Sequence, residues 1–130
     1  MYHKDFDKWN LVKKQINDTD REISIRAGEV RWVSFGVNIG SEIDGKGTSF
    51  NRPALVVGVF GAHLALIVPL TSKNKSIPGY IPFEWKGKTD MLCVNQMRVV
   101  SQKRIFSRLA HISDKHLQKC KDEVKCFFEL

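Results

Sequence analysis

Short β-rich runs, separated by turn-forming residues, are the feature that most limits what this chain can fold into. Runs rich in valine, leucine and isoleucine recur with turn signals about every eight to twelve residues, a spacing that favours a small β-barrel or sandwich. The predicted strands are residues 29–35, 53–60, 64–70, 80–85, 91–94, 98–100 and 104–106. In the first of them, alternation predicts Val30 and Trp32 on one face and Arg31 and Val33 on the other.

Helical patterns stand at the two ends of the chain. Residues 5–17 predict a short amphipathic helix capped by Asp5 or Asp7, with apolar residues at offsets of three and four. Ser113 is predicted to cap a C-terminal helix that has an apolar stripe of its own. The stripe positions are Trp9, Val12 and Ile16 in the first helix, and Leu117, Cys120, Val124 and Phe127 or Phe128 in the second.

The N-terminal helix lies before the β-rich region, so the chain divides into two parts. Residues 1–27 are predicted to form a helical appendage, and residues 28–130 a single β-rich domain. Packing on the domain, exchange between subunits and fraying are all compatible with the appendage. No apolar run approaches the roughly 20 residues that span a bilayer, and the N-terminus lacks the apolar core of a signal peptide. We therefore expect a cytoplasmic protein with no membrane partner.

The composition favours some function classes over others. Lysine and arginine number 21 against 14 aspartate and glutamate, and the formal net charge of +7 indicates a nucleic acid or an acidic protein as partner. Three cysteines, Cys93, Cys120 and Cys126, form no CxxC pattern and have no histidine pair nearby. Cys120 and Cys126 would be rotated by about 240° on a helix and cannot pair there. We expect buried reduced thiols, no metal site and no cofactor.

A long polar loop and the arginine behind it carry the candidate chemistry. Residues 36–51 are rich in glycine, serine and aspartate, and they are too long for a tight hairpin, which is typical of a functional loop. Arg52 stands at the start of the apolar strand that follows, and Thr71 and Ser72 end the next strand. Reactive side chains are commonly placed where strand ends face such a loop.

Several short pieces of the chain, in this order, resemble the MazF/PemK family of toxin ribonucleases. They are GEVRWV at 28–33, GSE at 40–42, RPALVV at 52–57, PLTS at 69–72, NQMR at 95–98 and LAHIS at 109–113. The resemblance implies a mainly β protein with small helices (α+β), an SH3-like β-barrel with a C-terminal helix, usually a homodimer. It also implies metal-independent, sequence-specific cleavage of single-stranded RNA such as mRNA, neutralised by an acidic antitoxin protein.

The resemblance assigns roles to four residues. Cleavage of RNA without a metal uses the ribose 2′-hydroxyl as nucleophile and leaves a 2′,3′-cyclic phosphate and a 5′-hydroxyl. Negative charge grows on the nonbridging phosphate oxygens, where fixed cations and hydrogen-bond donors stabilise it. Arg52 suits this role because a guanidinium pairs with phosphate through two hydrogen bonds. Thr71, supported by Ser72, is expected to hold the phosphate or the 2′-oxygen, and Glu42 to position a base or the loop.

A second set of residues is expected to hold the RNA. Lysines supply charge, and an aromatic ring supplies a stacking surface worth about 1–3 kcal/mol per base in single-strand binders. The expected lysines are Lys46, Lys73, Lys75, Lys86 and Lys88. For stacking, Phe50 in the polar loop is preferred to Trp85. Gln96 and Arg98 are expected to brace the barrel or the dimer.

The chain differs from some members of the family at the positions of the proton-transfer residues, so other mechanisms and functions remain as alternatives. Some members use an arginine and an aspartate as acid and base at positions where this chain has Cys93 and Asn95, which cannot exchange protons that way at neutral pH. A histidine pair, His111 and His116, is one rival. The others are a non-catalytic basic SH3-like module that binds nucleic acid or a peptide, and an antitoxin-binding protein whose catalysis is vestigial.

Overall fold

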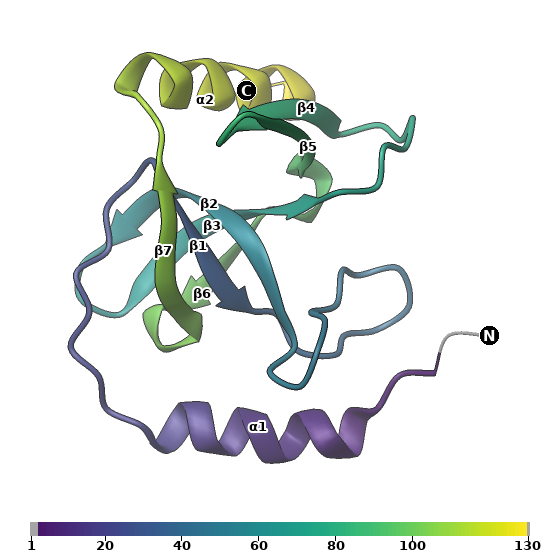
Figure 1. Ribbon diagram of the computed structural model, residues 1–130, viewed down its shortest axis with the longest axis vertical. Coiled ribbons are helices and arrows are strands. Elements are labelled where there is room, and N and C mark those ends of the chain that lie inside the picture. The colour runs from purple at the N-terminus through teal and green to yellow at the C-terminus, as the bar shows by residue number, and fades with distance from the viewer. Residues whose placement is uncertain (1–2, 130) are drawn as a thin grey trace.

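Antiparallel strands wind into a barrel that lies between two helices at opposite ends of the molecule (Figure 1). The computed structural model describes residues 3–129. The strands are β1 (Glu29–Ser34), β2 (Asn51–Phe60), β3 (Leu64–Thr71), β4 (Tyr80–Trp85), β5 (Lys88–Cys93), β6 (Arg98–Ser101) and β7 (Ile105–His111). The helices are α1 (Phe6–Asp18) and α2 (Asp114–Phe128), and two 3-10 turns are η1 (Val94–Gln96) and η2 (Gln102–Arg104).

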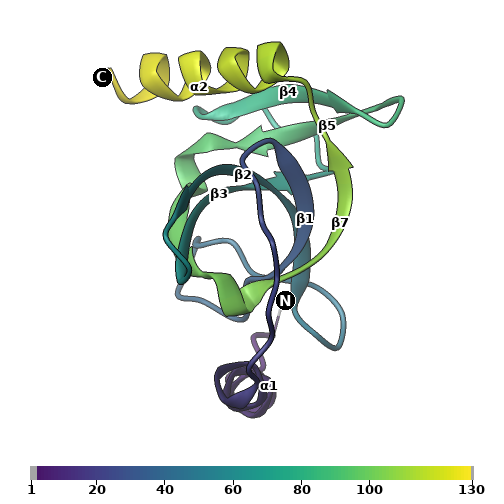
Figure 2. The ribbon, with the colours of Figure 1, turned by 90° about the vertical axis from the view of Figure 1, so that its left-hand side faces the viewer.

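Strand β3 is the centre of the sheet. The strand order is β4-β5-β3-β2-β1-β7, and β6 pairs with β3 outside this path. The first half of β3 pairs with β6 and its last residues pair with β5, while β2 runs along its other edge. Viewed from the side in Figure 2, β1, β2, β3 and β7 curve around a closed interior. The predicted mainly β barrel with a C-terminal helix is confirmed.

Two buried clusters fill the interior, and α2 closes one of them. The first cluster joins inward residues of β2, β3, β4 and β5 to the predicted stripe of α2, where Leu117, Cys120 and Val124 are buried. The second lies inside β1, β2, β3 and β6. Ser113 caps α2 as predicted, since its hydroxyl accepts a hydrogen bond from the amide of His116 at 3.1 Å. Phe127 and Phe128 end the helix largely exposed.

Helix α1 packs against the connection between β1 and β2. Asp5 is its cap, and the Asp5 carboxylate accepts a hydrogen bond from the amide of Lys8 at 3.0 Å. The predicted stripe faces the barrel and forms a third, small cluster with two residues of the connection. The members of this cluster are Trp9, Val12, Ile16, Val37 and Phe50. Among residues 3–129, no helix is long and apolar enough to cross a membrane.

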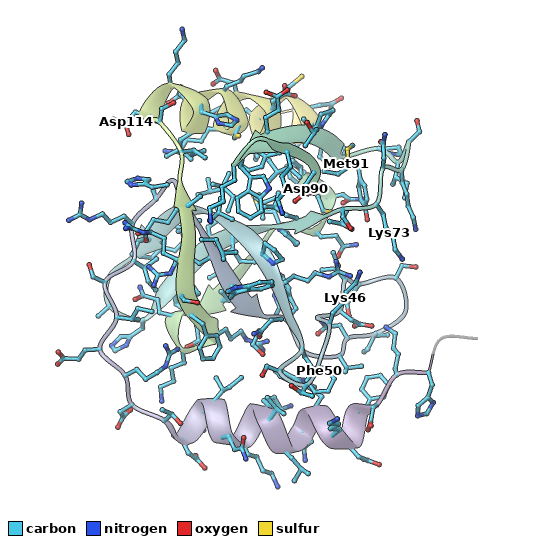
Figure 3. All side chains as sticks on the ribbon, in the orientation of Figure 1. Lys46, Phe50, Lys73, Asp90, Met91 and Asp114 are labelled. Atoms are coloured by element: carbon cyan, nitrogen blue, oxygen red, sulfur yellow. The ribbon has the colours of Figure 1, made fainter. Side chains whose placement is uncertain are left out.

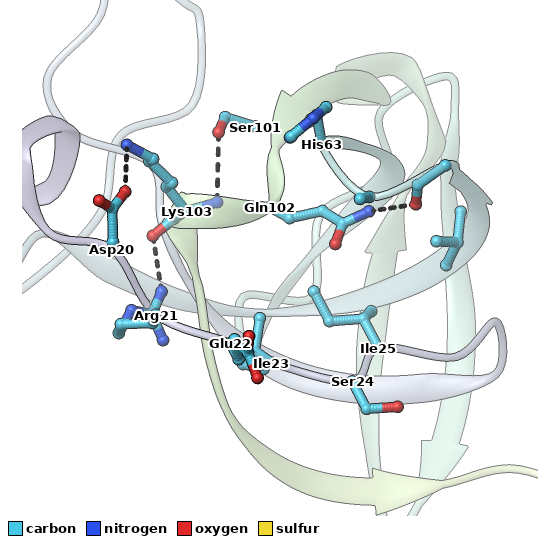
Figure 4. Close-up of a pocket in the computed structure, with 13 residues that line it drawn as sticks. Asp20, Arg21, Glu22, Ile23, Ser24, Ile25, His63, Ser101, Gln102 and Lys103 are labelled. Atoms are coloured by element: carbon cyan, nitrogen blue, oxygen red, sulfur yellow. Dashed lines mark hydrogen bonds and ion pairs between the residues drawn. The ribbon is translucent and has the colours of Figure 1, made fainter.

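The segment between α1 and β1, residues 19–28, runs up one side of the barrel (Figure 1). It is tied to η2 by Arg21, whose guanidinium donates to the carbonyls of Lys103 and Ile105 at 2.8 and 2.9 Å. Lys103 in turn lies 3.6 Å from a carboxylate oxygen of Asp20 (Figure 4). These contacts hold the segment that connects α1 to β1 against the side of the barrel.

The predicted alternation in the first strand is wrong. Val30 is fully buried, but Trp32, predicted on the same face, is 37% exposed, and Arg31 is buried. The physical reason is that the pairing of β1 with β7 shifts register on both sides of Arg31, and such bulges interrupt the two-residue period of a strand. Trp32 therefore points to the surface, although every other residue of β1 is buried.

Other differences from the predicted elements are smaller. Strand β5 begins at Lys88 rather than Met91, because Lys86 and Gly87 both adopt positive φ and close a two-residue hairpin turn. Strand β7 continues to His111, beyond the predicted end at residue 106. Cys93 and Cys120 are buried free thiols, as expected, whereas Cys126 is exposed.

A buried carboxylate joins the first strand to its neighbours. Glu29 is 3% exposed, and its Oε1 accepts hydrogen bonds from the amide of Arg26 at 2.7 Å and from the guanidinium of Arg31 at 3.0 Å. Arg108 on β7 lies 3.5 Å from the other oxygen. Burial alone would raise the pKa of Glu29, but the hydrogen bonds from Arg26 and Arg31 and the charges of Arg31 and Arg108 together lower it.

We predict that the stability of the protein falls as Glu29 becomes protonated. Because the folded-state pKa is lowered, the contribution of Glu29 is complete above its unfolded pKa of about 4.3 and is lost as the pH falls through the folded value. Glu29→Gln should lower the free energy of unfolding by about 2–3 kcal/mol at pH 7 and flatten the loss of stability on acidification. Urea unfolding between pH 7 and pH 3, with the exposed Glu22→Gln as control, measures this. Equal stability of Glu29→Gln and wild type at pH 7 would contradict it.

Candidate active site

The pairing of β2 with β3 brings the two main candidate residues together. Ala54 pairs with Pro69, and the same antiparallel register, continued by two residues, sets Arg52 opposite Thr71. Strand β1 pairs with the other edge of β2 and brings Trp32 to the same end of the sheet. The chemistry-bearing residues are therefore positioned by backbone hydrogen bonds between rigid strands.

A groove of about 670 Å³ opens at this end of the sheet, between the β1–β2 loop (residues 35–50) and strands β5 and β7. Its walls combine positive charge, hydroxyl groups and two aromatic rings. The polar side chains that line it include Lys46, Asn51, Arg52, Thr71, Ser72 and Lys88, and the rings are those of Trp32 and Phe106. This composition is suited to a chain of phosphates and bases.

Arg52 is held in place by the loop beside it. It is half-buried, and its Nε donates a hydrogen bond to the main-chain carbonyl of Asp44. The charge of Arg52 acts on its surroundings, since it is the largest cause that lowers the pKa of Lys46, followed by burial and by the charge of Lys73. The charges of Arg52, Lys46 and Lys73 thus lie close enough to act on one another, and Figure 3 shows Lys46 and Lys73 on the same side of the molecule. An anion bound between them would relieve their mutual repulsion.

Thr71 and Ser72 stand across from Arg52 in two different environments. Thr71 is 6% exposed, and its hydroxyl oxygen accepts a hydrogen bond from the amide of Lys73 at 3.3 Å. A hydroxyl that accepts one hydrogen bond keeps its own proton to donate. Ser72 is exposed at the rim. Thr71 is therefore the more rigid of the two hydroxyl groups.

Glu42 does not meet Arg52 and Thr71. Its carboxylate accepts a hydrogen bond from the amide of Ile39 at 2.8 Å and so shapes a turn inside the loop. It lines a separate depression with Asn95 and Gln96. The structure thus places Glu42 where it acts on the loop, away from the groove.

Gln96 supports the same loop from the barrel side. Its Oε1 accepts a hydrogen bond from the amide of Ile43 at 3.2 Å, and its Nε2 donates to the carbonyl of Ser41 at 3.1 Å. Gln96 therefore braces the β1–β2 loop. This role differs from the expected one, in which Gln96 braces the barrel or the dimer.

The expected lysines divide into those that border the groove and those that do not. Lys46 and Lys88 line it, and the charge of Lys73 reaches Lys46. The Lys88 ammonium lies 4.4 Å from the centre of the Trp85 ring and 3.9 Å from a carboxylate oxygen of Asp90. Lys75 follows in the exposed segment after β3, and Lys86 forms the β4–β5 turn; neither is among the described residues that line the groove.

The two rings expected to stack on bases are both buried, so this expectation is wrong. Phe50 is 9% exposed, and its ring packs edge-on against Trp9 with centroids 5.6 Å apart. Trp85 is 7% exposed, and its indole nitrogen donates to Asp90 at 2.9 Å. The rings that line the groove are instead those of Trp32 and Phe106.

Neither of these two rings was found from the sequence. The exposure of Trp32 depends on the bulges in β1, for which the sequence has no signal. For Phe106 a signal was available, because it stands in a run of mainly polar residues, QKRIFSR at 102–108. The guanidinium of Arg21, 4.4 Å from the centre of the Phe106 ring, covers part of that ring.

The residues considered for acid–base catalysis lie elsewhere. Cys93 is fully buried, and burial raises the pKa of its thiol, offset only in part by a hydrogen bond from Tyr80 and by the charge of Arg52. His111 ends β7, and His116 stacks on Phe83 at 4.9 Å between centroids. His63 lines a separate pocket of about 590 Å³ beside η2 (Figure 4). Within residues 3–129, no three His, Cys, Asp or Glu side chains are grouped as metal ligands would be.

Comparison with known proteins assigns the chain to a family. Residues 26–128 match the sequence profile of the PemK-like, MazF-like toxins of type II toxin–antitoxin systems. The match extends over most of the chain, so the protein belongs to this family, and the resemblance read from the sequence pieces is confirmed. No curated protein sequence matches the chain significantly.

Solved structures agree on the fold. The chain is similar to MazF from Deinococcus radiodurans, with a TM-score of 0.64 at 23% identity over 84% of this chain and 100% of that one. It is similar to an endoribonuclease from a mycobacterial species in complex with its cognate antitoxin, with a TM-score of 0.60 at 13% identity over 82% and 97% of the chains. A MazE–MazF structure from Deinococcus radiodurans contains a chain with a TM-score of 0.58 at 20% identity, over 84% and 99%. At these identities the likeness shows the fold.

We predict that the pKa of Lys46 rises when Arg52 is removed. The charge of Arg52 is the largest cause that lowers this pKa, so Arg52→Ala should move it back toward its ordinary value. A nuclear magnetic resonance titration of the Lys46 side chain measures the change. Lys86→Ala, which removes one charge from outside the groove lining, should leave the pKa of Lys46 where it is. No change in Arg52→Ala would mean that the two cations do not share one site.

Proposed function

We propose that this protein is an endoribonuclease that cleaves single-stranded RNA, including mRNA, at short sequences without a metal ion. The observation that carries the proposal is that Arg52 and Thr71 line one groove, which also holds Lys46 and receives the charge of Lys73. Membership of the toxin family supports the same activity. The groove is lined by two aromatic rings, which favours a single-stranded substrate over a duplex.

In the proposed reaction the scissile phosphate lies between Arg52 and Thr71. The ribose 2′-oxygen attacks phosphorus, the bond to the 5′-oxygen breaks, and the products are a 2′,3′-cyclic phosphate and a 5′-hydroxyl. The guanidinium of Arg52 stabilises the charge on the nonbridging oxygens, and the Thr71 hydroxyl, with Ser72 at the rim, donates to the phosphate. Both groups act best in the transition state, where this charge is greatest.

Proton transfer in this reaction does not involve the family's acid and base positions. Cys93 is buried and protonated, and Asn95 lines the other depression. Lys46 lines the groove and carries a proton that its ammonium can give to the departing 5′-oxygen. The 2′-hydroxyl proton passes to water.

The remaining expectations are proposals about partners and organisation. The net charge of +7 and the antitoxin-bound endoribonuclease among the similar structures support an acidic antitoxin that neutralises this protein. We also propose a homodimer, a cytoplasmic location, and the division into an appendage, residues 1–27, and a domain, residues 28–130. A non-catalytic module that only binds nucleic acid or a peptide is the second candidate function, favoured by the residues Cys93 and Asn95.

We predict that RNA cleavage in the presence of EDTA depends on both groups of the proposed site. Arg52→Ala and Thr71→Ala should each lower kcat by about 10²–10³, the usual effect of removing one transition-state donor. Thr71→Ser should keep most of the activity, and Lys125→Ala on α2 should keep all of it. Product ends are identified by mass spectrometry. Absence of cleavage of several long RNAs by the folded wild type would favour the binding module. Cleavage unaffected by Arg52→Ala and by Thr71→Ala would show that the active site lies elsewhere.

We predict that Trp32, and not Phe50, contributes to RNA affinity. Trp32→Ala should raise the Kd for a short 2′-O-methyl RNA, which cannot be cleaved, by about 5–100-fold, the effect of about 1–3 kcal/mol of stacking. Trp32→Phe should restore much of the affinity. Phe50→Leu should lower the melting temperature while its Kd stays close to that of the wild type. Fluorescence anisotropy measures the affinities, and an unchanged Kd in Trp32→Ala would rule out stacking on this ring.

A further inference from the structure

Helix α1 packs against the β1–β2 loop and η2. Trp9 is 6% exposed and packs between Phe50 of the β1–β2 loop and the guanidinium of Arg104, whose carbon is 5.6 Å from the ring centre. Its ring lies directly against the backbone of Gly36, where an added Cβ would come within 2.2 Å of the indole. The first turn of the loop is therefore shaped to receive this tryptophan. Figure 3 shows Phe50 next to α1.

Lys4, two residues before the helix, holds the far side of the same loop. The ammonium of Lys4 donates to the carbonyls of Asn38 and Gly40 at 2.6 and 2.8 Å, and it lies 3.3 Å from a carboxylate oxygen of Asp44. The other oxygen of Asp44 accepts a hydrogen bond from the amide of Asn38 at 2.6 Å. Lys4 and Asp44 together tie the two arms of the loop to each other.

Asp44 connects this fastening to Arg52. The side chain of Asp44 is 9% exposed and pairs with Lys4, while its main-chain carbonyl accepts the Nε proton of Arg52. Next to it, the amide of Gly45 donates to the carbonyl of Gly36 at 2.8 Å, directly beneath the Trp9 ring. A continuous path of contacts therefore runs from α1 through Asp44 to the guanidinium in the groove.

We propose that α1 and Lys4, two residues before it, form a clamp that holds the β1–β2 loop and, through Asp44, sets the position of the Arg52 guanidinium. Lys4, Trp9 and Asp44 are positioning residues in this proposal, which rests on the proposed ribonuclease activity. The family profile begins at residue 26, after α1, so the clamp lies outside the part of the chain that the profile matches.

The physical purpose of the clamp follows from the composition of the loop. Residues 35–50 include four glycines, at positions 36, 40, 45 and 47, and each glycine adds backbone freedom that must be lost when the loop orders around a substrate. A clamp that orders the loop beforehand removes this cost from binding and catalysis. Misplacement of a catalytic group by about 1 Å can lower the rate by about 10²-fold, so the position of Arg52 matters strongly.

The first test measures cleavage kinetics in the full chain. Lys4→Ala should lower kcat about tenfold or more and change KM less, because Lys4 does not touch the substrate. Lys4→Arg, which can reach the same three acceptors, should restore activity, and Lys8→Ala, an exposed lysine one turn further along, should behave as wild type. In an Arg52→Ala background, Lys4→Ala should lower kcat no further, since the guanidinium that Lys4 positions is gone. Full additivity of the two changes would overturn the positioning role.

The second test does not depend on cleavage. Nuclear magnetic resonance should show faster hydrogen exchange of the Arg52 Nε proton and of the Gly45 amide in Lys4→Ala and in Trp9→Leu, with the β2–β3 amides unchanged. Unchanged exchange of these loop protons would overturn the clamp even if RNA is cleaved. Faster exchange in the variants with unaltered kcat would overturn the positioning role. If the wild type cleaves no RNA but the variants still exchange faster than the wild type, the clamp is supported while the ribonuclease proposal fails.

Discussion

The antiparallel pairing of β2 with β3 is the interaction on which the rest of the structure depends. β3 shares backbone hydrogen bonds with β2, β5 and β6, so both core clusters are assembled along it. The same register that aligns Ala54 with Pro69 places Arg52 opposite Thr71. A slip of one residue would turn the apolar side chains outward and separate the candidate catalytic pair, so stability and the site are set by one pairing.

The groove combines groups that repel one another with a backbone that holds them in place. The charge of Arg52, burial and the charge of Lys73 all lower the pKa of Lys46, because nearby cations and the loss of solvent disfavour its charged form. A phosphate would reverse this effect by neutralising the cations. The loop that contributes Lys46 has little core of its own and is fastened by Gln96 on one side and by Lys4 and Trp9 on the other.

Some elements were predictable because their signals are local. The cap of α1 at Asp5, one of the two candidates, and the hairpin around Lys86 and Gly87 follow from neighbouring residues alone. The stripe of α2 is buried at Leu117, Cys120 and Val124, whereas Phe127 and Phe128 at its end are exposed. Phe50 was misread because burial in a polar loop depends on a helix about forty residues away in the chain, which no local pattern reveals. Glu42 was expected, from the family resemblance, to position a base or the loop, and the fold of the loop places it beside Gln96, away from the groove.

The order and type of the strands and helices and the family can be read from the amino-acid sequence, which also gives Arg52 and Thr71 as candidates, because periodicity, caps and short motifs are properties of nearby residues. Which side chains share the groove was decided by the tertiary structure. The bulges in β1 turn Trp32 outward, and the docking of α1 removes Phe50 from solvent. Both depend on contacts between residues far apart in the chain, and the free energy of such contacts is not encoded in any short segment.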